Sequence, residues 1–315
     1  MVIAVTGATG FLGSALLERL STQYGVVALV RKEPLVRLAG VDYRICGDLS
    51  PSQEWSHLLP GVDVVIHTAA RVHVMDASSS AAVNEFRRTN VEGTINLAQQ
   101  AANGGAKRFI FLSSIKVNGE FTDPDRPFSA EDGPNPQEAY SISKMEAEQG
   151  LQEIGAKCGM EIVCIRPPLV YGPGVKGNFL SMLRWLKLGV PLPLGSIHNK
   201  RSLVSLENLV DLIITCIDYP AAANQIFLVS DDEDLSTSEL LQRMSAALGQ
   251  SVRLIPVPAK LLQMGAQMLG KKDVAQRLFG NLQVDISKTK NLLGWSPPMS
   301  VNEGLRKTAK WYLRQ

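Results

Sequence analysis

An apolar run, a glycine-rich turn and an amphipathic stretch follow one another at the start of the chain. Residues 2–5 are continuously apolar, which is typical of a strand buried on both faces. Apolar side chains then recur at helical spacing from Phe11 to Leu20. A strand, a tight turn and a helix in this order predict the first unit of a parallel sheet covered by helices.

The same alternation continues as far as about residue 172. Strands are predicted at residues 26–30, 43–46, 62–67, 108–113 and 161–165, and a long helix runs from Phe86 to the Gly104-Gly105 pair. Right-handed crossovers make such a chain a doubly wound α/β (Rossmann) fold. Farther on, residues 226–229 favour one more strand of this sheet, and residues 236–249 and 301–315 favour helices.

Prolines and glycines interrupt the pattern after residue 172. We therefore expect a dinucleotide-binding domain of residues 1–172 plus about 201–230. A smaller α/β substrate domain would comprise residues 173–200 and 231–315.

Composition excludes several classes of function. The net charge of +2 gives no footprint for nucleic acid or for an anionic membrane surface. No apolar run of about 18–20 residues predicts a membrane span, and the sequence has no signal-peptide pattern, so we expect a cytoplasmic protein. The four cysteines form no CxxC pair and the four histidines are scattered, so no metal site is expected.

The turn after the first strand reads Thr6-Gly7-Ala8-Thr9-Gly10-Phe11-Leu12-Gly13, a GxxGxxG pattern. Glycines there let a pyrophosphate approach the helix N-terminus, where free N–H groups and the helix dipole hold it. The alternative is a tight turn without a ligand. Strand–turn–helix context favours a dinucleotide site.

Arg31 and Lys32 follow the second strand, where an NAD enzyme usually carries an acid that binds the ribose. A guanidinium pairs with a 2′-phosphate, whereas a carboxylate repels it. We therefore expect NADP(H), with NAD(H) as the alternative if the two side chains are an ordinary solvated pair.

Tyr140 and Lys144 stand four residues apart, so they share one face of a helix. A nearby ammonium favours the phenolate and lowers the pKa of a tyrosine, which a proton-transferring tyrosine needs. Ser114 follows the predicted strand at residues 108–113, where its hydroxyl can bind a substrate oxygen. These three residues are the candidate catalytic group.

Motifs in this order resemble those of the extended short-chain dehydrogenase/reductases, in the nucleotide-sugar epimerase/dehydratase/reductase group. Beyond the glycine turn, the Ser114 position and the Tyr140–Lys144 pair, the likeness covers Gly47-Asp48-Leu49, His67-Thr68-Ala69-Ala70, the NVEGT of residues 90–94, Arg166-Pro167, the VYGPG of residues 170–174 and the LGWSP of residues 293–297. The resemblance runs along nearly the whole chain.

The resemblance implies two sets of binding residues. The expected cofactor contacts are Gly7, Thr9, Gly10, Phe11, Leu12, Gly13, Arg31, Lys32, Asp48, Leu49, Ala69, Ala70, Tyr140, Lys144 and Pro167. The expected contacts to a UDP-sugar are Ser114, Tyr140, Asn178, Phe179 and Arg201, with Arg71, His73, Lys116 and Asn118 as weaker candidates that are also explained as loop residues. The group commonly forms homodimers, here through helices near residues 83–103 and 136–156.

Three reactions of this group compete. Similar dehydratases carry an Asp-Glu pair after the catalytic hydroxyl residue, and Ile115 and Lys116 stand there instead, which disfavours elimination of water. Epimerases usually retain NAD, whereas Arg31 and Lys32 favour NADPH.

The run of residues 113–119 also looks like that of the reductases of UDP-2-acetamido-2,6-dideoxy-4-ketohexoses, which serve bacterial surface polysaccharide (O-antigen) synthesis. We therefore expect reduction of a C4 ketone to UDP-N-acetylquinovosamine or UDP-N-acetylfucosamine. The alternatives are a UDP-glucose or UDP-N-acetylglucosamine 4-epimerase with bound NAD, and a non-catalytic dinucleotide-binding regulatory protein.

Overall fold

The computed structural model describes residues 1–315 except 73–79, 269–275 and 277. Within these ranges, seven parallel strands form one sheet in the order β3-β2-β1-β4-β5-β6-β9. Their bounds are β1 Val2–Thr6, β2 Gly25–Val30, β3 Val41–Ile45, β4 Val64–His67, β5 Arg108–Leu112, β6 Glu161–Arg166 and β9 Gln225–Leu228. The predicted doubly wound α/β fold is confirmed.

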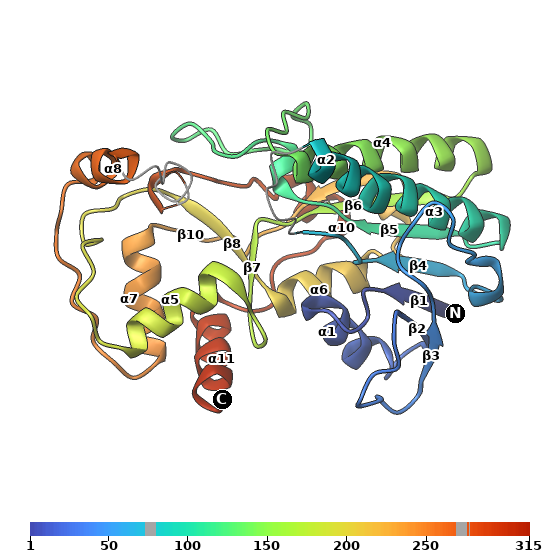
Figure 1. The fold of residues 1–315 in the computed structure, drawn as a ribbon, viewed down its shortest axis with the longest axis horizontal. Helices are drawn as coiled ribbons and strands as arrows, with labels where there is room; N and C mark the ends of the chain where they lie inside the picture. The colour runs from blue at the N-terminus through green and yellow to red at the C-terminus, as the bar shows by residue number, and fades with distance from the viewer. Residues whose placement is uncertain (73–79, 269–275, 277) are drawn as a thin grey trace.

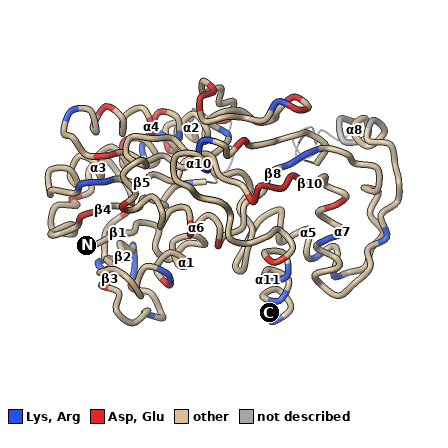
Figure 2. Tube along the Cα trace, turned by 180° about the vertical axis from the view of Figure 1, so that it is seen from behind, with Lys and Arg blue, Asp and Glu red and all other residues tan. Residues whose placement is uncertain are grey.

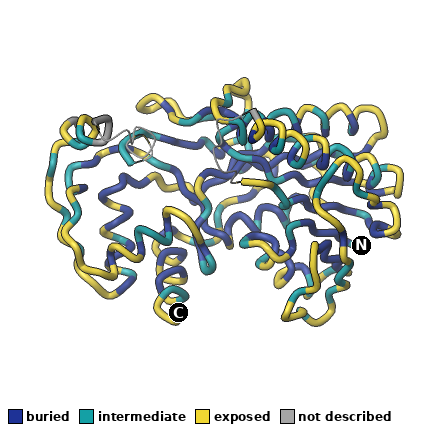
Figure 3. The backbone as a smooth tube through the Cα atoms, in the orientation of Figure 1, coloured by how far each residue is buried: buried dark blue, intermediate teal, exposed yellow. Residues whose placement is uncertain are grey.

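Helices cover both faces of this sheet, as Figure 1 shows. Both faces need a cover because both faces of β1 are apolar. Ile3 and Val5 belong to one buried cluster, and Ala4 belongs to another on the opposite face. One layer holds α1 (Phe11–Leu20) and α6 (Leu206–Thr215). The other layer holds α2 Ser80–Phe86, the π-helical turn η2 Arg87–Glu92, α3 Gly93–Asn103 and α4 Ala139–Cys158. Figure 3 shows that the strands between these layers are largely buried, apart from the edge strand β3.

A smaller unit lies beside the carboxyl ends of the strands (Figure 1). Its sheet has the order β10-β8-β7, with bounds β10 Asp234–Leu235, β8 Arg201–Ser205 and β7 Leu169–Tyr171. Its helices are α5 Gly177–Lys187, α7 Thr237–Ala247, α8 Ala259–Met268 and α11 Val301–Leu313. Ser236 is the N-cap of α7 and forms a capping box with Glu239. The short α10 (Ser287–Leu293) returns to pack on β9.

Strand β8 pairs with β7 and β10 and not with the large sheet. A buried network joins the two units at this point. The Tyr171 hydroxyl donates to Asp231 at 2.7 Å, and Asp231 also accepts from the Ser205 N–H at 2.8 Å and from Asn208 at 2.7 Å. Burial raises the pKa of Asp231.

Basic and acidic residues are interspersed along the chain (Figure 2). No helix among the described residues combines the length and the apolar character needed to cross a membrane.

Candidate active site

The turn between β1 and α1 requires glycine at two positions. Gly7 has a φ of +66°, and a Cβ there would lie 2.8 Å from the Ala69 nitrogen. A Cβ on Gly13 would lie 2.1 Å from the Gly7 carbonyl oxygen. The glycines therefore bring β1, the turn and the residues after β4 into contact that any side chain would prevent.

The N-terminus of α1 is open to an anion. Its N-cap Gly10 makes no side-chain capping bond, and the first turn has no acidic residue. Free N–H groups and the helix dipole at such an end favour a phosphate. Thr9 and Gly10 are exposed, whereas the Leu12 side chain is buried, so Leu12 can face a ligand only with its backbone. This cradle fits the pyrophosphate of a dinucleotide.

Arg31 has a carboxylate neighbour. Its Nη1 lies 3.4 Å from Asp48 Oδ1, and both side chains are exposed, at 77% and 84%. Lys32 is exposed beside it. Leu49, next to Asp48, packs against the buried cluster on one face of the large sheet. A Cβ on Gly93 would lie 2.9 Å from Leu49 Cγ, so α3 packs closely against the segment that carries Asp48 and Leu49.

Asn90 ties the residues after β4 to the helix that carries Tyr140. Its amide oxygen accepts from the Arg71 N–H at 2.8 Å, and its amide nitrogen donates to the Arg71 carbonyl at 3.0 Å and to Ser143 Oγ at 3.1 Å. It lies in η2, where the wider π-helical turn interrupts the predicted long helix. Sequence reasoning matched Asn90 to a motif but missed this bridging role. Ala69 and Ala70, half-buried, lie directly before Arg71.

Ser114 and Pro167 lie at the carboxyl ends of neighbouring strands. Ser114 is the N-cap of the short 3-10 helix η3 (Ile115–Val117), and its Oγ accepts from the Lys116 N–H at 3.3 Å. The Ile115 N–H donates to the Pro167 carbonyl at 3.0 Å. Ile115 is buried in the core, so it contributes no polar group to the site.

Tyr140 and Lys144 both lie in the first turns of α4, as predicted. The Tyr140 ring meets Phe86 edge-on, with centroids 6.2 Å apart, and burial raises the pKa of Tyr140 to about 12. Lys144 Nζ donates to the Leu112 carbonyl at 2.7 Å and lies 4.4 Å from the Phe111 ring centroid. Burial lowers the pKa of Lys144 to about 7.

The expected lowering of the tyrosine pKa by the lysine is not found in this structure. The Lys144 ammonium is bonded to the carbonyl of Leu112 on β5, and burial of the phenol dominates the pKa of Tyr140. Helical spacing thus placed the two residues on one face but could not give the direction of a four-carbon side chain.

His67 is a buried structural residue beside this pair. Its ring nitrogens lie 2.6 Å from Thr6 Oγ1 and 2.9 Å from Thr94 Oγ1. Burial, with a smaller effect of the nearby Lys144, lowers the pKa of His67 to about 3. A neutral ring therefore joins β1, β4 and α3 under the site.

Asn118, predicted as a weaker substrate contact, is held in a buried hydrogen-bond network in this structure. It is 2% exposed, its amide nitrogen donates to the Ser129 carbonyl at 2.9 Å, and its oxygen accepts from Arg166 at 2.9 Å. Arg166 in turn forms two hydrogen bonds to the buried Glu148, of 2.9 Å and 2.5 Å. Sequence reasoning missed this ion pair beneath α4.

The substrate residues expected in the smaller unit differ in how far their side chains are buried and in what they contact. Asn178 is exposed in the first turn of α5. Phe179 is fully buried, its ring stacked on Tyr171 with centroids 5.3 Å apart, so its side chain belongs to the core and only its backbone could meet a ligand. Arg201 begins β8, and its Nη1 donates to the Gly280 carbonyl at 3.1 Å.

Two of the weaker substrate candidates, Arg71 and Lys116, form ion pairs with carboxylates of the chain. Arg71 pairs with Glu85 at 2.8 Å. Lys116 Nζ lies 2.6 Å from Glu138 and 2.9 Å from Glu120. His73 lies outside the described residues.

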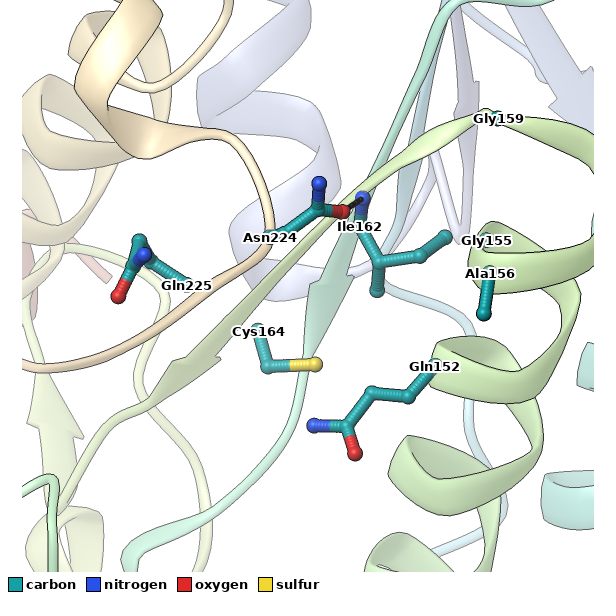
Figure 4. A pocket seen from close by; sticks show the side chains of 8 residues that line it. All are labelled: Gln152, Gly155, Ala156, Gly159, Ile162, Cys164, Asn224 and Gln225. Carbon is teal, nitrogen blue, oxygen red and sulfur yellow. Dashed lines mark hydrogen bonds between the residues drawn. The ribbon is translucent and has the colours of Figure 1, made fainter.

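A cavity of about 310 Å³ lies between the second half of α4 and strands β6 and β9 (Figure 4). Its lining runs from Gln152 to Gly159 on the helix side and includes Ile162, Cys164, Asn224 and Gln225. Gln152 is twelve residues beyond Tyr140, about 18 Å along a helix. The cavity contains none of the predicted site residues. No group of three or more potential metal ligands occurs among the described residues.

Residues 3–230 match the Epimerase family, described as the NAD dependent epimerase/dehydratase family. The chain belongs to this family. One relative, a UDP-glucose 4-epimerase of Vibrio cholerae, is 47% identical over 315 residues, which cover 99% of this chain and 95% of that protein. An N-acetyl-alpha-D-glucosaminyl-diphospho-ditrans,octacis-undecaprenol 4-epimerase of Escherichia coli O157:H7 is 26% identical over 98% of this chain and 94% of its own length.

Solved structures of the same fold include the UDP-N-acetylglucosamine 4-epimerase of Bacillus cereus, with a TM-score of 0.80 at 21% identity over 100% of both chains. The UDP-glucuronic acid 4-epimerase of Bacillus cereus, in complex with NAD, has a TM-score of 0.79 at 19% identity and covers 100% of this chain and 99% of that one. At these identities the likeness concerns the fold.

The prediction of a 4-keto reductase is wrong. The Vibrio cholerae relative, similar over nearly the full length of both chains, is a 4-epimerase. The prediction of NADP(H) has no support either, because the solved relative with a dinucleotide described above holds NAD.

Proposed function

We propose that this protein is a UDP-hexose 4-epimerase that uses NAD. The observation that carries the proposal is the 47% identity to a UDP-glucose 4-epimerase over 99% of the chain. Ser114 follows β5, Lys144 bonds the last residue of β5, and Tyr140 lies one turn earlier on α4, which supports catalysis over a purely regulatory role.

The chain's own residues suit NAD. Gly7, Gly10, Gly13 and the open end of α1 would hold its pyrophosphate. The Arg31 guanidinium lies beside Asp48, whose carboxylate would repel a 2′-phosphate brought near it. When bound, NAD supplies oxidation of the sugar carbon and the reduction that reverses it.

Tyr140 moves the proton in this account. Its phenolate takes the proton of the sugar 4-hydroxyl and its phenol returns it, while Ser114 Oγ binds the same substrate oxygen. Because burial raises the pKa of Tyr140 to about 12, a nearby positive charge must favour the phenolate during catalysis. Lys144, one helical turn away, supplies that charge.

Elimination of water is not part of the proposal, since it needs a second acid/base pair beside the catalytic hydroxyl. Ile115 is apolar and buried, and Lys116 is held by two carboxylates. Arg201 and Asn178 are proposed to contact the nucleotide diphosphate, and a homodimer remains part of the proposal.

The experiment is conversion of UDP-glucose by the purified protein with NAD, followed by proton NMR. Appearance of UDP-galactose supports the proposal, and parallel incubation with UDP-N-acetylglucosamine defines the substrate. A protein that binds NAD and converts neither sugar would contradict it.

A further inference from the structure

Lys116 connects the two segments that carry Ser114 and Tyr140. These residues are 26 positions apart in the sequence, one being the N-cap of η3 and the other lying on α4. Lys116 uses its backbone on one side, where its N–H donates to Ser114 Oγ at 3.3 Å. It uses its side chain on the other side, where Nζ donates to Glu138 Oε2 at 2.6 Å.

Glu138 is the residue from which α4 begins. It is the N-cap, its side chain accepts from the Ser141 N–H, and its own N–H donates to Ser141 Oγ at 3.1 Å. This capping box fixes the first turn of the helix, and Tyr140 lies inside that turn. A group that holds Glu138 therefore also holds the backbone from which the phenol projects.

The ammonium of Lys116 is shared with a second carboxylate. Glu120 lies 2.9 Å away and is less exposed than Lys116, at 17% against 27% for the side chains. The contact is to Glu120 Oε2, whereas Glu120 Oε1 is buried without a hydrogen-bond partner in the described part of the chain. The Glu138 side chain is more exposed, at 46%, so the ammonium is held between one partly buried and one half-exposed carboxylate.

We propose that Lys116 is a positioning residue that sets the distance between the Ser114 hydroxyl and the Tyr140 phenol. This rests on the proposed function, because both groups must meet one substrate oxygen. The neighbouring backbone supports the same geometry, since the Asn135 N–H donates to the Val117 carbonyl at 2.8 Å. That hydrogen bond holds the loop before α4, and Lys116 adds the link to the helix end itself.

The test compares Lys116→Met, Lys116→Arg and Glu138→Gln with the native protein loaded with NAD. Met keeps the alkyl chain but removes the charge, and Gln keeps a capping acceptor while removing the ion pair. For Met and Gln we expect kcat to fall about 10-fold with KM changed less than about 2-fold, because small misplacements of reacting groups are costly. Arg should restore most of kcat. Lys307→Met, which breaks the exposed pair with Glu207, is the matched control and should leave kcat unchanged.

A second readout does not depend on the reaction. Hydrogen exchange of the first turn of α4 should quicken in Lys116→Met, while exchange of residues 150–158 stays as in the native protein. An unchanged kcat, a change in KM alone or unaltered exchange would each overturn the positioning role. If the native protein epimerises no sugar, the proposed function fails, and the exchange experiment still decides whether Lys116 holds the helix end.

Discussion

The Lys144 ammonium donates a hydrogen bond of 2.7 Å to the carbonyl oxygen of Leu112, the last residue of β5. The contact fixes a buried cation at the carboxyl end of the sheet, next to the Phe111 ring. In this arrangement burial of the phenol sets the pKa of Tyr140, although the two residues share a helix face.

Stability should depend on pH through Lys144. Its pKa is lowered by burial to about 7, whereas an unfolded lysine titrates near 10.4. Between these values the unfolded chain binds more protons, so the free energy of unfolding rises with pH, and below pH 7 the full cost of the buried charge applies.

Lys144→Met removes this dependence. From pH 7 to pH 9 the free energy of unfolding of the native protein should rise by about 2–3 kcal/mol more than that of the variant, as measured by urea denaturation. The exposed Lys307→Met should show no such trend. Parallel pH profiles for the native protein and Lys144→Met would contradict the burial of the charge.

Tyr140→Phe should lower kcat for epimerisation by about 10²–10⁴-fold, the usual contribution of a positioned acid/base. Binding of NAD should persist, since the glycine turn is untouched. Steady-state kinetics and NAD titration by fluorescence measure the two effects. Full activity in this variant would instead assign the proton transfer to another group.

Gly13→Ala should abolish tight NAD binding and destabilise the fold by about 1–3 kcal/mol, because overpacking forces the backbone to shift. The added Cβ would lie 2.1 Å from the Gly7 carbonyl oxygen. Gly133→Ala is the control, since a Cβ there meets nothing within 4 Å. Calorimetric NAD titration and thermal unfolding report the outcome, and equal behaviour of the two variants would argue against the cradle.

The buried pair of Arg166 and Glu148 should be costly to break from one side. Glu148→Gln leaves a buried guanidinium without its counter-ion, and we expect a loss of about 3–5 kcal/mol. The double variant Glu148→Leu with Arg166→Met should lose less than the single one. Chemical denaturation of the set measures this, and a larger loss in the double variant would refute the explanation.

Local patterns were sufficient for much of this fold. The bounds of the seven strands in the large sheet were predicted to within about two residues, because most buried parallel strands are continuously apolar. Tyr140 and Lys144 were paired from helical spacing alone. Long-range packing decided the rest. Asn118 belongs to a buried polar network because it bonds Arg166, which is distant in the sequence. Phe179 belongs to the core because its ring stacks on Tyr171, which lies on another element. Strand pairing likewise assigned residues 201–205 to the smaller sheet.

The reaction itself could not be read from residues near the catalytic group. Arg31 predicts NADP only if its guanidinium has no carboxylate neighbour, and the structure places Asp48 beside it. The similarity of the whole chain to a 4-epimerase corrected a prediction that rested on the short run of residues 113–119.

Isotope retention at the reacting carbon tests the central claim most directly. The protein with NAD is incubated with UDP-glucose deuterated at C4, and the product is examined by NMR while reduced cofactor is followed by absorbance. We predict UDP-galactose that keeps deuterium at C4, with no net change in cofactor. Stoichiometric consumption of a reduced cofactor on a 4-keto sugar, with no epimerisation, would contradict the account.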